Sequence, residues 1–418
     1  MKLTVTILVG SLKLVLLIGL AFHAVQALDR DRSITQFHHT SWTARDGAPS
    51  QITAFAQTLD GFLWIGSARG LFRFDGVIFE PFVAPDGVEL PSHSIYSLIA
   101  TSDGGLWISF NPSGLAFFKD GEIRVLSRAD EIPQSHVYCF AQDLDGRIWA
   151  GTHTGIAQFD GARWVDFGSQ VDLTNDRVWT MFVDRDGTLW VATDKTVIYV
   201  KRGSDTFQST GAHVGKGVPQ IAQAKDGQIW MTEYFKRTKP LILGDSDPSR
   251  TKPILPEKGI KMLFDRDGVL WMTVASSGIR RIRFPENLGK RQGSGHPEIE
   301  SFKARDGLTD DSANHLFEDR EGNIWVSSGK GLDRFRYSHF VPVSLPAGYQ
   351  NLTLLGGNDG DIWVASGNEK PILRIRGSSI QTSGPPMRVS SVYKDKGGTI
   401  WWGGFGGVWR QRAGAYTF

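Results

Sequence analysis

Few residues in this chain have the type and spacing of a catalytic site. His38 and His39 are adjacent, so on a strand they would point to opposite faces and could not bind one metal ion together. Residues 211–217 are similar to a phosphate-binding loop, but the segment is one residue short and has no Ser or Thr for magnesium. We therefore interpret it as a loop between strands. His-Glu-x-x-His and Gly-x-Ser-x-Gly motifs are absent from the sequence.

Two further groups of reactive residue types have simpler structural explanations. Asp-x-Asp-Gly sequences, as at 143–146, are superficially similar to calcium loops but lack the further ligands of one. We expect their Asp side chains to bond their own backbone. The single Cys139 cannot form an internal disulfide, and we interpret it as a small buried apolar side chain rather than a reactive thiol. No catalytic residue, metal site or cofactor is predicted.

The elements that position these residues are repeated along the chain. One phrase occurs nine times: an acidic residue or Gly, then Gly, any residue, Leu or Ile, and Trp. The repeated residues are Trp64, Trp107, Trp149, Trp190, Trp230, Trp271, Trp325, Trp363 and Trp401. Steps of 38 to 43 residues separate them, apart from one of 54. A period near 40 indicates an array of equivalent units.

Each unit reads as four short strands. In the second unit the runs 94–100, 106–109, 114–118 and 123–126 are rich in β-branched and aromatic residues, and Gly-containing turns separate them. Asp-Gly between such runs is a strong hairpin signal, because tight hairpin turns need positive φ. The repeat region shows no sustained helical period. The sequence therefore predicts an all-β fold, a β-propeller of four-stranded blades in nine repeats, with the repeated Trp filling the gap between neighbouring sheets.

The segment before the first repeat indicates how the ring closes. Residues 37–47 parallel residues 299–307 at the end of the sixth repeat, so they read as a fourth strand that lacks its own first three. Such a strand closes a propeller by completing the blade at the other end. Because rings usually hold about four to eight blades, we expect a seven-bladed ring over 33–340. Residues 341–418 are then expected to begin a second, truncated propeller.

The N-terminus indicates export. An apolar run over 3–22, interrupted by Lys13, follows Lys2, and residues 25–27 fit a cleavage site. We predict a signal peptide over 1–27 and a periplasmic or other extracytoplasmic location. An uncleaved membrane anchor is the alternative, because the run approaches the roughly 20 residues of a spanning helix. The net charge is only +2 and no Lys/Arg run stands out, so nucleic acid is not an expected partner.

Several repeats carry a family pattern. Residues 143–149 and 265–271 read Asp-x-Asp-Gly-x-Leu/Ile-Trp, and 70–76 and 155–161 read Gly-Leu/Ile-x-Arg/Gln-Phe-Asp-Gly. These sequences, and 42–47 before the first repeat, resemble the two-component regulator propeller repeat. The likeness covers the chain from about residue 35 onward. The likeness is weaker in the fourth, fifth and eighth repeats.

The resemblance implies a role in sensing. Such repeats usually form paired seven-bladed propellers outside the bacterial inner membrane and sense a ligand for a sensor histidine kinase, in the same chain or a separate one. No kinase motif occurs in these 418 residues, so we expect a non-catalytic sensing region. The alternatives are a secreted propeller enzyme of glycosidase or lyase type and a protein-interaction scaffold. A glycosidase would need two convergent carboxylates, whereas the acidic residues here lie mainly in the repeated turns.

Strand direction locates the expected recognition face. The nearly uniform Asp-Gly turns share one face, and the links between units and the loops between second and third strands share the variable opposite face. Aromatic rings beside hydrogen-bonding groups there would suit a small polar ligand such as an oligosaccharide. The alternative is that these are solvated loop residues or blade-packing aromatics. The candidates are Arg69, His153, Lys195, Tyr234 and Lys330 in the loops, Ser94, His136 and Arg177 at starts of first strands, and Tyr96, Tyr138 and Trp179 two residues further along.

Overall fold

The structure is a computed structural model, and it divides into two compact units after His339. It describes residues 28–418 except 86, 127–135, 168–172, 174–175, 216, 235–237, 242–254, 256–258, 289–297, 341–342, 344, 358–359 and 378. The predicted signal peptide, residues 1–27, lies outside the described residues. Within the described ranges, no helix is long and apolar enough to cross a membrane.

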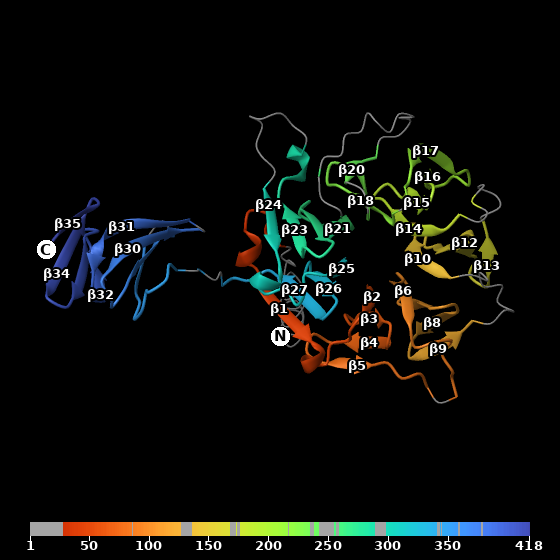
Figure 1. Ribbon diagram of the computed structural model, residues 1–418, viewed down its shortest axis with the longest axis horizontal. Helices are drawn as coiled ribbons and strands as arrows, with labels where there is room; N and C mark the ends of the chain where they lie inside the picture. Colours follow the sequence, from red (N-terminus) through yellow and green to blue (C-terminus); the bar gives the residue numbers. More distant parts are fainter. Residues whose placement is uncertain are drawn as a thin grey trace, which may run out of the picture. The chain divides into compact units, whose positions relative to one another are not determined.

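Seven antiparallel sheets form the first unit and stand as blades around a centre (Figure 1). The first three blades contain β2 (Ile52–Gln57), β3 (Leu63–Ser67), β4 (Gly70–Phe74) and β5 (Phe79–Pro81); β6 (Ile95–Ala100), β7 (Leu106–Phe110), β8 (Leu115–Lys119) and β9 (Glu122–Val125); and β10 (Val137–Gln142), β11 (Ile148–Thr152), β12 (Gly155–Phe159) and β13 (Trp164–Asp166). The next three contain β14 (Val178–Val183), β15 (Leu189–Thr193), β16 (Thr196–Val200) and β17 (Gln208–His213); β18 (Pro219–Gln223), β19 (Ile229–Glu233) and β20 (Lys239–Pro240); and β21 (Gly259–Phe264), β22 (Leu270–Val274), β23 (Ile279–Ile282) and β24 (Ile299–Phe302).

The seventh blade is built from both ends of the unit. It contains β25 (Ala313–Glu318), β26 (Ile324–Ser328), β27 (Gly331–Arg336) and the N-terminal β1 (His38–Thr43). Short 3₁₀ turns complete the described elements: η1 (Ile34–Gln36), η2 (Ala44–Asp46), η5 (Pro285–Asn287) and η6 (Ala304–Asp306). The first strand of each blade contacts the first strands of both neighbours, from β2 round to β25 and back to β2. These findings confirm the predicted all-β propeller.

The repeated tryptophans form the core between blades, as predicted. Trp149 of the third blade packs on Val178 and Leu189 of the fourth, and the same arrangement recurs around the ring. Trp325 of the seventh blade packs on Ile65 and other residues of the first. A large flat side chain at one position per blade therefore excludes water from each interface.

The N-terminal segment closes the ring. β1 pairs antiparallel with β27, from His38 opposite Arg336 to Thr43 opposite Gly331. Trp42 stacks on Trp325 with ring centroids 5.7 Å apart. This pairing covers the edge that β27 would otherwise expose, and it confirms the predicted closing strand.

Residues before β1 add a second attachment. Arg281 is fully buried and donates hydrogen bonds to the backbone oxygens of Arg32 and Asp29, at 2.6 and 3.2 Å. It also forms an ion pair with Glu300 at 2.8 Å. Leu28 is buried in the same core cluster as Trp271. The chain from Leu28 onward is thus part of the ring's packing against β22 and β23.

Polar contacts link the Asp-Gly turns of neighbouring blades. The last residue of a first strand accepts a hydrogen bond from the turn backbone of the preceding blade, as when Gln223 accepts from Arg185 N at 3.0 Å and Glu318 from Arg266 N at 3.3 Å. Gln142 accepts in the same way from Ser102 N at 2.8 Å. These contacts connect the Asp-Gly turns of one blade to the next.

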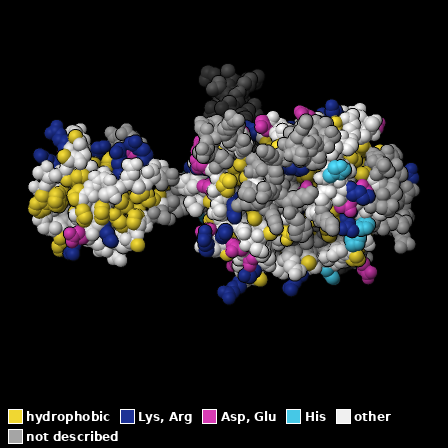
Figure 2. Space-filling model, turned by 45° about the horizontal axis from the view of Figure 1, so that its top comes forward, with side chains coloured by type: hydrophobic (Ala, Val, Ile, Leu, Met, Phe, Trp, Pro, Cys, Tyr) yellow, Lys and Arg dark blue, Asp and Glu magenta, His cyan; other side chains and the backbone are white. Residues whose placement is uncertain are grey.

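The second unit, from Phe340 to Phe418, contains two further sheets. They are β28 (Thr353–Gly356), β29 (Ile362–Ala365), β30 (Lys370–Arg376) and β31 (Ser379–Met387), then β32 (Val389–Lys394), β33 (Ile400–Gly404), β34 (Gly407–Arg412) and β35 (Ala415–Thr417). Trp363 packs between them beside Met387 and Trp402. Trp401 remains 38% exposed, and hydrophobic side chains gather on the surface of this unit (Figure 2).

Candidate functional site

A cavity of about 660 Å³ lies in the channel of the ring. We call it the channel cavity. Its lining comes from all seven blades and mainly from the first half of each first strand, as with Thr53, Tyr96, Tyr138, Trp179 and Lys261. First strands begin on the face that carries the links between blades. The channel cavity therefore belongs to the face that the sequence predicted for recognition.

Because of β-bulges in the first strands, consecutive residues of one strand can both line the cavity. The pairing of the first and second strands shifts register after the first residue in six of the seven blades, for example between Val137 and Cys139 and between Val178 and Thr180. A bulge re-aims one side chain, so two consecutive residues can face the same side. Tyr138 and Cys139 accordingly both line the cavity, as do Trp179 and Thr180.

Three of the predicted aromatic residues form one continuous cluster across the second, third and fourth blades. Tyr138 lies edge-on to Tyr96 with centroids 5.2 Å apart and tilted against Trp179 at 4.9 Å. His136 stacks on the Tyr138 ring at 5.9 Å. The predicted stacking residues are therefore neighbours in space, although about 40 residues of sequence separate them.

Two polar residues join this cluster. The Arg177 guanidinium lies 4.9 Å from the ring centre of Trp179 and donates a hydrogen bond to His153 Nδ1 at 3.2 Å. Because an arginine N–H only donates, Nδ1 of His153 is an acceptor, and it also receives the Tyr138 hydroxyl at 3.1 Å. The ring N–H of His153 therefore lies on Nε2. Tyr96, His136, Tyr138, His153, Arg177 and Trp179 are called the aromatic cluster below.

The other five predicted residues have different surroundings. Tyr234 lines the channel cavity. Lys195 forms an ion pair with Asp176, and Lys330 forms one with Asp310 at 2.7 Å. Arg69 is exposed, and its backbone N–H bonds Ser67 Oγ at 3.1 Å. Ser94 accepts a backbone hydrogen bond from Asn111 at 2.8 Å.

Sequence reasoning missed a group of hydrogen-bonded polar residues in the wall of the channel cavity. Gln220 Nε2 donates to Thr180 Oγ1 at 2.8 Å, and Gln220 Oε1 accepts from Lys261 Nζ at 3.0 Å. Burial lowers the pKa of Lys261 to about 8 and that of His315 to about 3. Cys139, predicted to be buried, is half-buried and lines the cavity, while desolvation raises the pKa of its thiol to about 12 and so disfavours the reactive thiolate.

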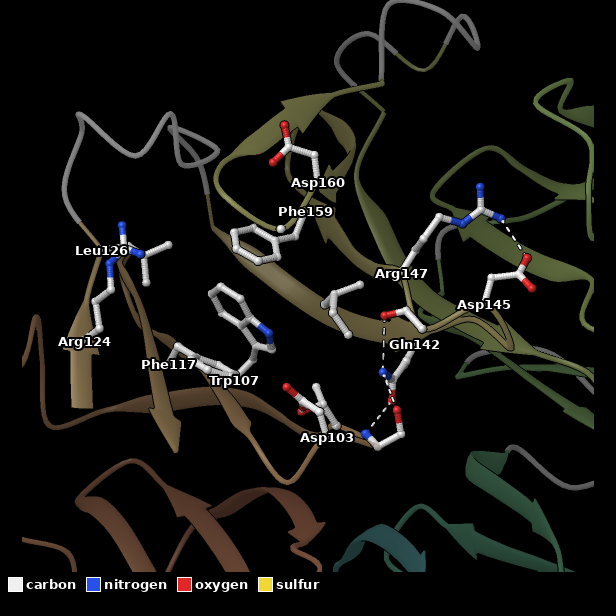
Figure 3. Close-up of a pocket in the computed structure, with 15 residues that line it drawn as sticks. Asp103, Trp107, Phe117, Arg124, Leu126, Gln142, Asp145, Arg147, Phe159 and Asp160 are labelled. Carbon is white, nitrogen blue, oxygen red and sulfur yellow. Dashed lines mark hydrogen bonds and ion pairs between the residues drawn. The ribbon is translucent and has the colours of Figure 1, made fainter. Parts of the chain in front are cut away.

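A second cavity, of about 620 Å³, lies between the second and third blades on the turn face (Figure 3). Trp107 and Phe159 form its apolar wall, with centroids 4.9 Å apart. Its acidic groups already have partners. Lys119 lies 2.8 Å from Asp103 and, with the Thr101 hydroxyl, lowers the Asp103 pKa to about 2. Asp145 pairs with Arg202 at 2.6 Å. We therefore rank this cavity behind the channel cavity.

The Asp side chains of the repeated turns bond their own backbone, as predicted. Asp143 Oδ1 accepts from the backbone N–H groups of Asp145 and Arg147 at 3.0 and 2.9 Å. Its other oxygen accepts the Trp149 indole N–H at 3.0 Å. Across the part of the chain that is described, no group of three or more His, Cys, Asp or Glu side chains is placed to hold a metal ion.

The fold is similar to several solved propellers. The extracellular domain of BT3049 of B. thetaiotaomicron, described as a hybrid two component system, matches with a TM-score of 0.64 and 17% identity over 90% of this chain and 53% of that chain. Virginiamycin B lyase from Staphylococcus aureus matches with a TM-score of 0.53 and 15% identity over 72% of this chain and 100% of that chain. YCF48 from Cyanidioschyzon merolae matches with a TM-score of 0.51 and 12% identity over 71% of this chain and 98% of that chain.

At these identities the likeness shows the fold alone, and this chain spans about half the length of the B. thetaiotaomicron domain. A search of curated protein sequences finds no match. The family profile described as "Two component regulator propeller" matches residues 172–195 and 307–330, in the fourth and seventh repeats. Two repeats of this chain, the fourth and the seventh, therefore match the two-component regulator propeller repeat.

Proposed function

We propose that the ring is the ligand-sensing region of an extracytoplasmic two-component signalling protein, and that the ligand binds at the aromatic cluster and the channel cavity. The observation that carries this proposal is the continuity of the six-residue cluster with a cavity of about 660 Å³. Pockets that bind small molecules typically combine apolar walls with a few convergent polar groups. The family of the repeats supports the signalling context.

The ligand that suits this surface is a small polar molecule such as an oligosaccharide. The faces of Tyr138 and Trp179 offer stacking surfaces, and Arg177 and the Tyr96 hydroxyl offer hydrogen bonds beside them. Rings of this kind present large contact areas at low entropic cost. A sensor histidine kinase, in the same chain of a longer protein or in a separate one, would receive the signal. The ring itself would act without catalysis.

The enzyme alternative requires a different surface. Glycoside hydrolysis needs two carboxyl groups flanking the bond that breaks. Among the described residues that line the channel cavity, none is Asp or Glu. Turnover of a bound saccharide, with release of a new reducing end, would instead support the enzyme alternative.

A thermal-shift screen tests the binding proposal. The exported protein would be heated with neutral and acidic oligosaccharides and other small metabolites, and hits repeated on Trp179→Ala and Arg177→Ala. We expect both substitutions to reduce the ligand-induced rise in melting temperature. The matched controls are Tyr393→Ala in the second unit and Arg73→Ala on β4, which should leave it unchanged. An unchanged rise in both cluster variants, with the fold intact, would remove this surface from consideration.

The proposed sensing function also requires that the protein is exported across the inner membrane. We propose cleavage after Ala27, which would leave Leu28 as the first residue of a periplasmic protein. N-terminal sequencing of protein recovered from the periplasm tests this. An intact Met1 terminus in the membrane fraction would favour the anchor.

A further inference from the structure

One cation, the half-buried Lys261, lines the channel cavity. Lys261 is the third residue of β21, and the bulge between Gly259 and Lys261 turns its side chain into the channel. Among the described residues of the wall, Lys261 is the one Lys or Arg, and none is an acid. Its Nζ donates to Gln220 Oε1 at 3.0 Å, which is a neutral acceptor.

Hydrogen bonds fix the position of the Lys261 ammonium through Gln220. Gln220 Nε2 donates to Thr180 Oγ1 at 2.8 Å and to the Pro219 carbonyl at 2.7 Å, so the orientation of its amide is fixed. The Lys261 backbone N–H bonds Thr273 Oγ1 at 3.0 Å. A chain of hydrogen bonds therefore runs across the fourth, fifth and sixth blades and presents one positive charge to the cavity. Such preorganisation reduces the entropy lost when a ligand binds.

The other titratable groups in the cavity do not neutralise this charge. Burial keeps His315 uncharged near neutral pH by lowering its pKa to about 3, and keeps Cys139 a thiol by raising its pKa to about 12. Burial raises the pKa of the Tyr96 hydroxyl as well. Burial lowers the pKa of Lys261 only to about 8, so the amine is mostly protonated at pH 7. A charge taken from water without a partner is costly, and an anion that enters the cavity supplies the missing partner.

We propose that the channel cavity binds an acidic ligand whose carboxylate pairs with Lys261 and whose ring lies against the aromatic cluster, as in a uronic acid or a saccharide that ends in one. This inference rests on the proposed ligand-sensing function and narrows its ligand to an anion. The cavity wall offers both parts of the interaction, a fixed ammonium and the aromatic side chains of Tyr138 and Trp179.

The test compares matched acid and neutral ligands on the full chain. Galacturonate and glucuronate are titrated by calorimetry beside galactose and glucose, and inorganic sulfate is added as a plain anion. We expect the acids to bind at least about ten-fold more tightly than their neutral partners, and Lys261→Met to remove that preference, because a hydrogen bond to a charged group is worth about ten-fold or more in affinity. Lys119→Met, at the end of β8 and paired with Asp103 away from the channel cavity, is the matched control and should leave the preference intact.

The melting temperature is a second measurement, and it shows whether the Lys261→Met variant is folded. Lys261 is half-buried and its side chain bonds the neutral Gln220, so Lys261→Met is expected to fold and to preserve the melting temperature of the free protein. Sulfate should raise the melting temperature of the parent protein and not that of Lys261→Met. No Lys261-dependent effect with either acid or with sulfate would overturn the anion site. Binding of the acids and their neutral partners with equal affinity to the parent protein would overturn it while leaving ligand sensing intact.

Discussion

In five of the nine repeats the turn opens with an acid, and that acid has two partners at once. Its first oxygen caps the turn backbone, and its second accepts the indole N–H of the tryptophan six residues later, as for Asp184 with Trp190 at 2.8 Å and Asp265 with Trp271 at 2.8 Å. In the first repeat the Thr58 hydroxyl takes the place of the acid and accepts from Trp64 at 2.9 Å. One side chain thus joins the hairpin turn to the core between blades.

Removing that side chain should cost stability. Asp143→Ala leaves the buried Trp149 N–H and two turn amides without an acceptor, and we expect a loss of about 2 kcal/mol in the free energy of unfolding. Urea unfolding measures the loss. Asp143→Thr, which copies the first repeat, should lose less. Equal losses in the two variants would contradict the role assigned to the indole bond.

Glu318 makes stability depend on pH. Burial raises its pKa from the ordinary 4.5 to about 7, against the opposing hydrogen bond from Arg266. The folded state therefore holds a proton that the unfolded state has released, and stability falls as pH rises from about 4.5 to about 7. Glu318→Gln places at this position the residue found at Gln57, Gln142 and Gln223.

We expect Glu318→Gln to raise the melting temperature at pH 7 and to flatten its fall with pH. A slope below pH 6 should persist, because burial also raises the pKa of Asp265, to about 6. Glu321→Gln, at an exposed glutamate of the same turn, is the control. Melting curves from pH 4 to pH 8 that coincide for the parent and Glu318→Gln would refute this assignment.

Among the elements, the packing between blades was predictable and the bulges were not. The spacing of Trp149 and its equivalents indicated a large residue at one fixed place per blade, and the structure confirms it. Strict alternation along a strand would place Lys261 on the side opposite Ile260, yet both line the cavity. A bulge arises from strand pairing, so the type of residue at 261 carries no signal of it. The aromatic residues were identified because they begin equivalent strands, whereas Lys261, Gln220 and Thr180 were missed.

The interface between blades predicts a large cost for losing its central ring. Trp149→Ala should lower the free energy of unfolding by about 3 to 5 kcal/mol, because the cavity left behind cannot fully close. Trp401 holds the equivalent place in the ninth repeat but is 38% exposed, against 4% for Trp149. Trp401→Ala should therefore cost clearly less in the stability of its own unit. Equal costs, measured by denaturant unfolding, would mean that burial does not decide the contribution.

At the scale of the whole ring, β1 is the closing element. A chain that begins after Thr43 would lose the six pairings to β27 and the stacking of Trp42 on Trp325. We expect it to melt at a lower temperature and to aggregate, because β27 would become an exposed edge. Adding a synthetic peptide of residues 28–47 should restore part of the melting temperature. An unchanged melting curve for the shortened chain would contradict the closing role.

The pairing of His38 with Arg336 also has a consequence for the order in which the strands pair during folding. Those partners are 298 residues apart in sequence, and closing so long a loop costs about 5 kcal/mol of chain entropy before the contact gives anything back. Pairings within each blade are local and form quickly, so the seam between β1 and β27 is expected to limit the rate of folding. Until then, an incomplete chain carries two unpaired strand edges that chaperones or proteases can bind. Of the strands of this ring, the first to be synthesised is thus the last to find its partner.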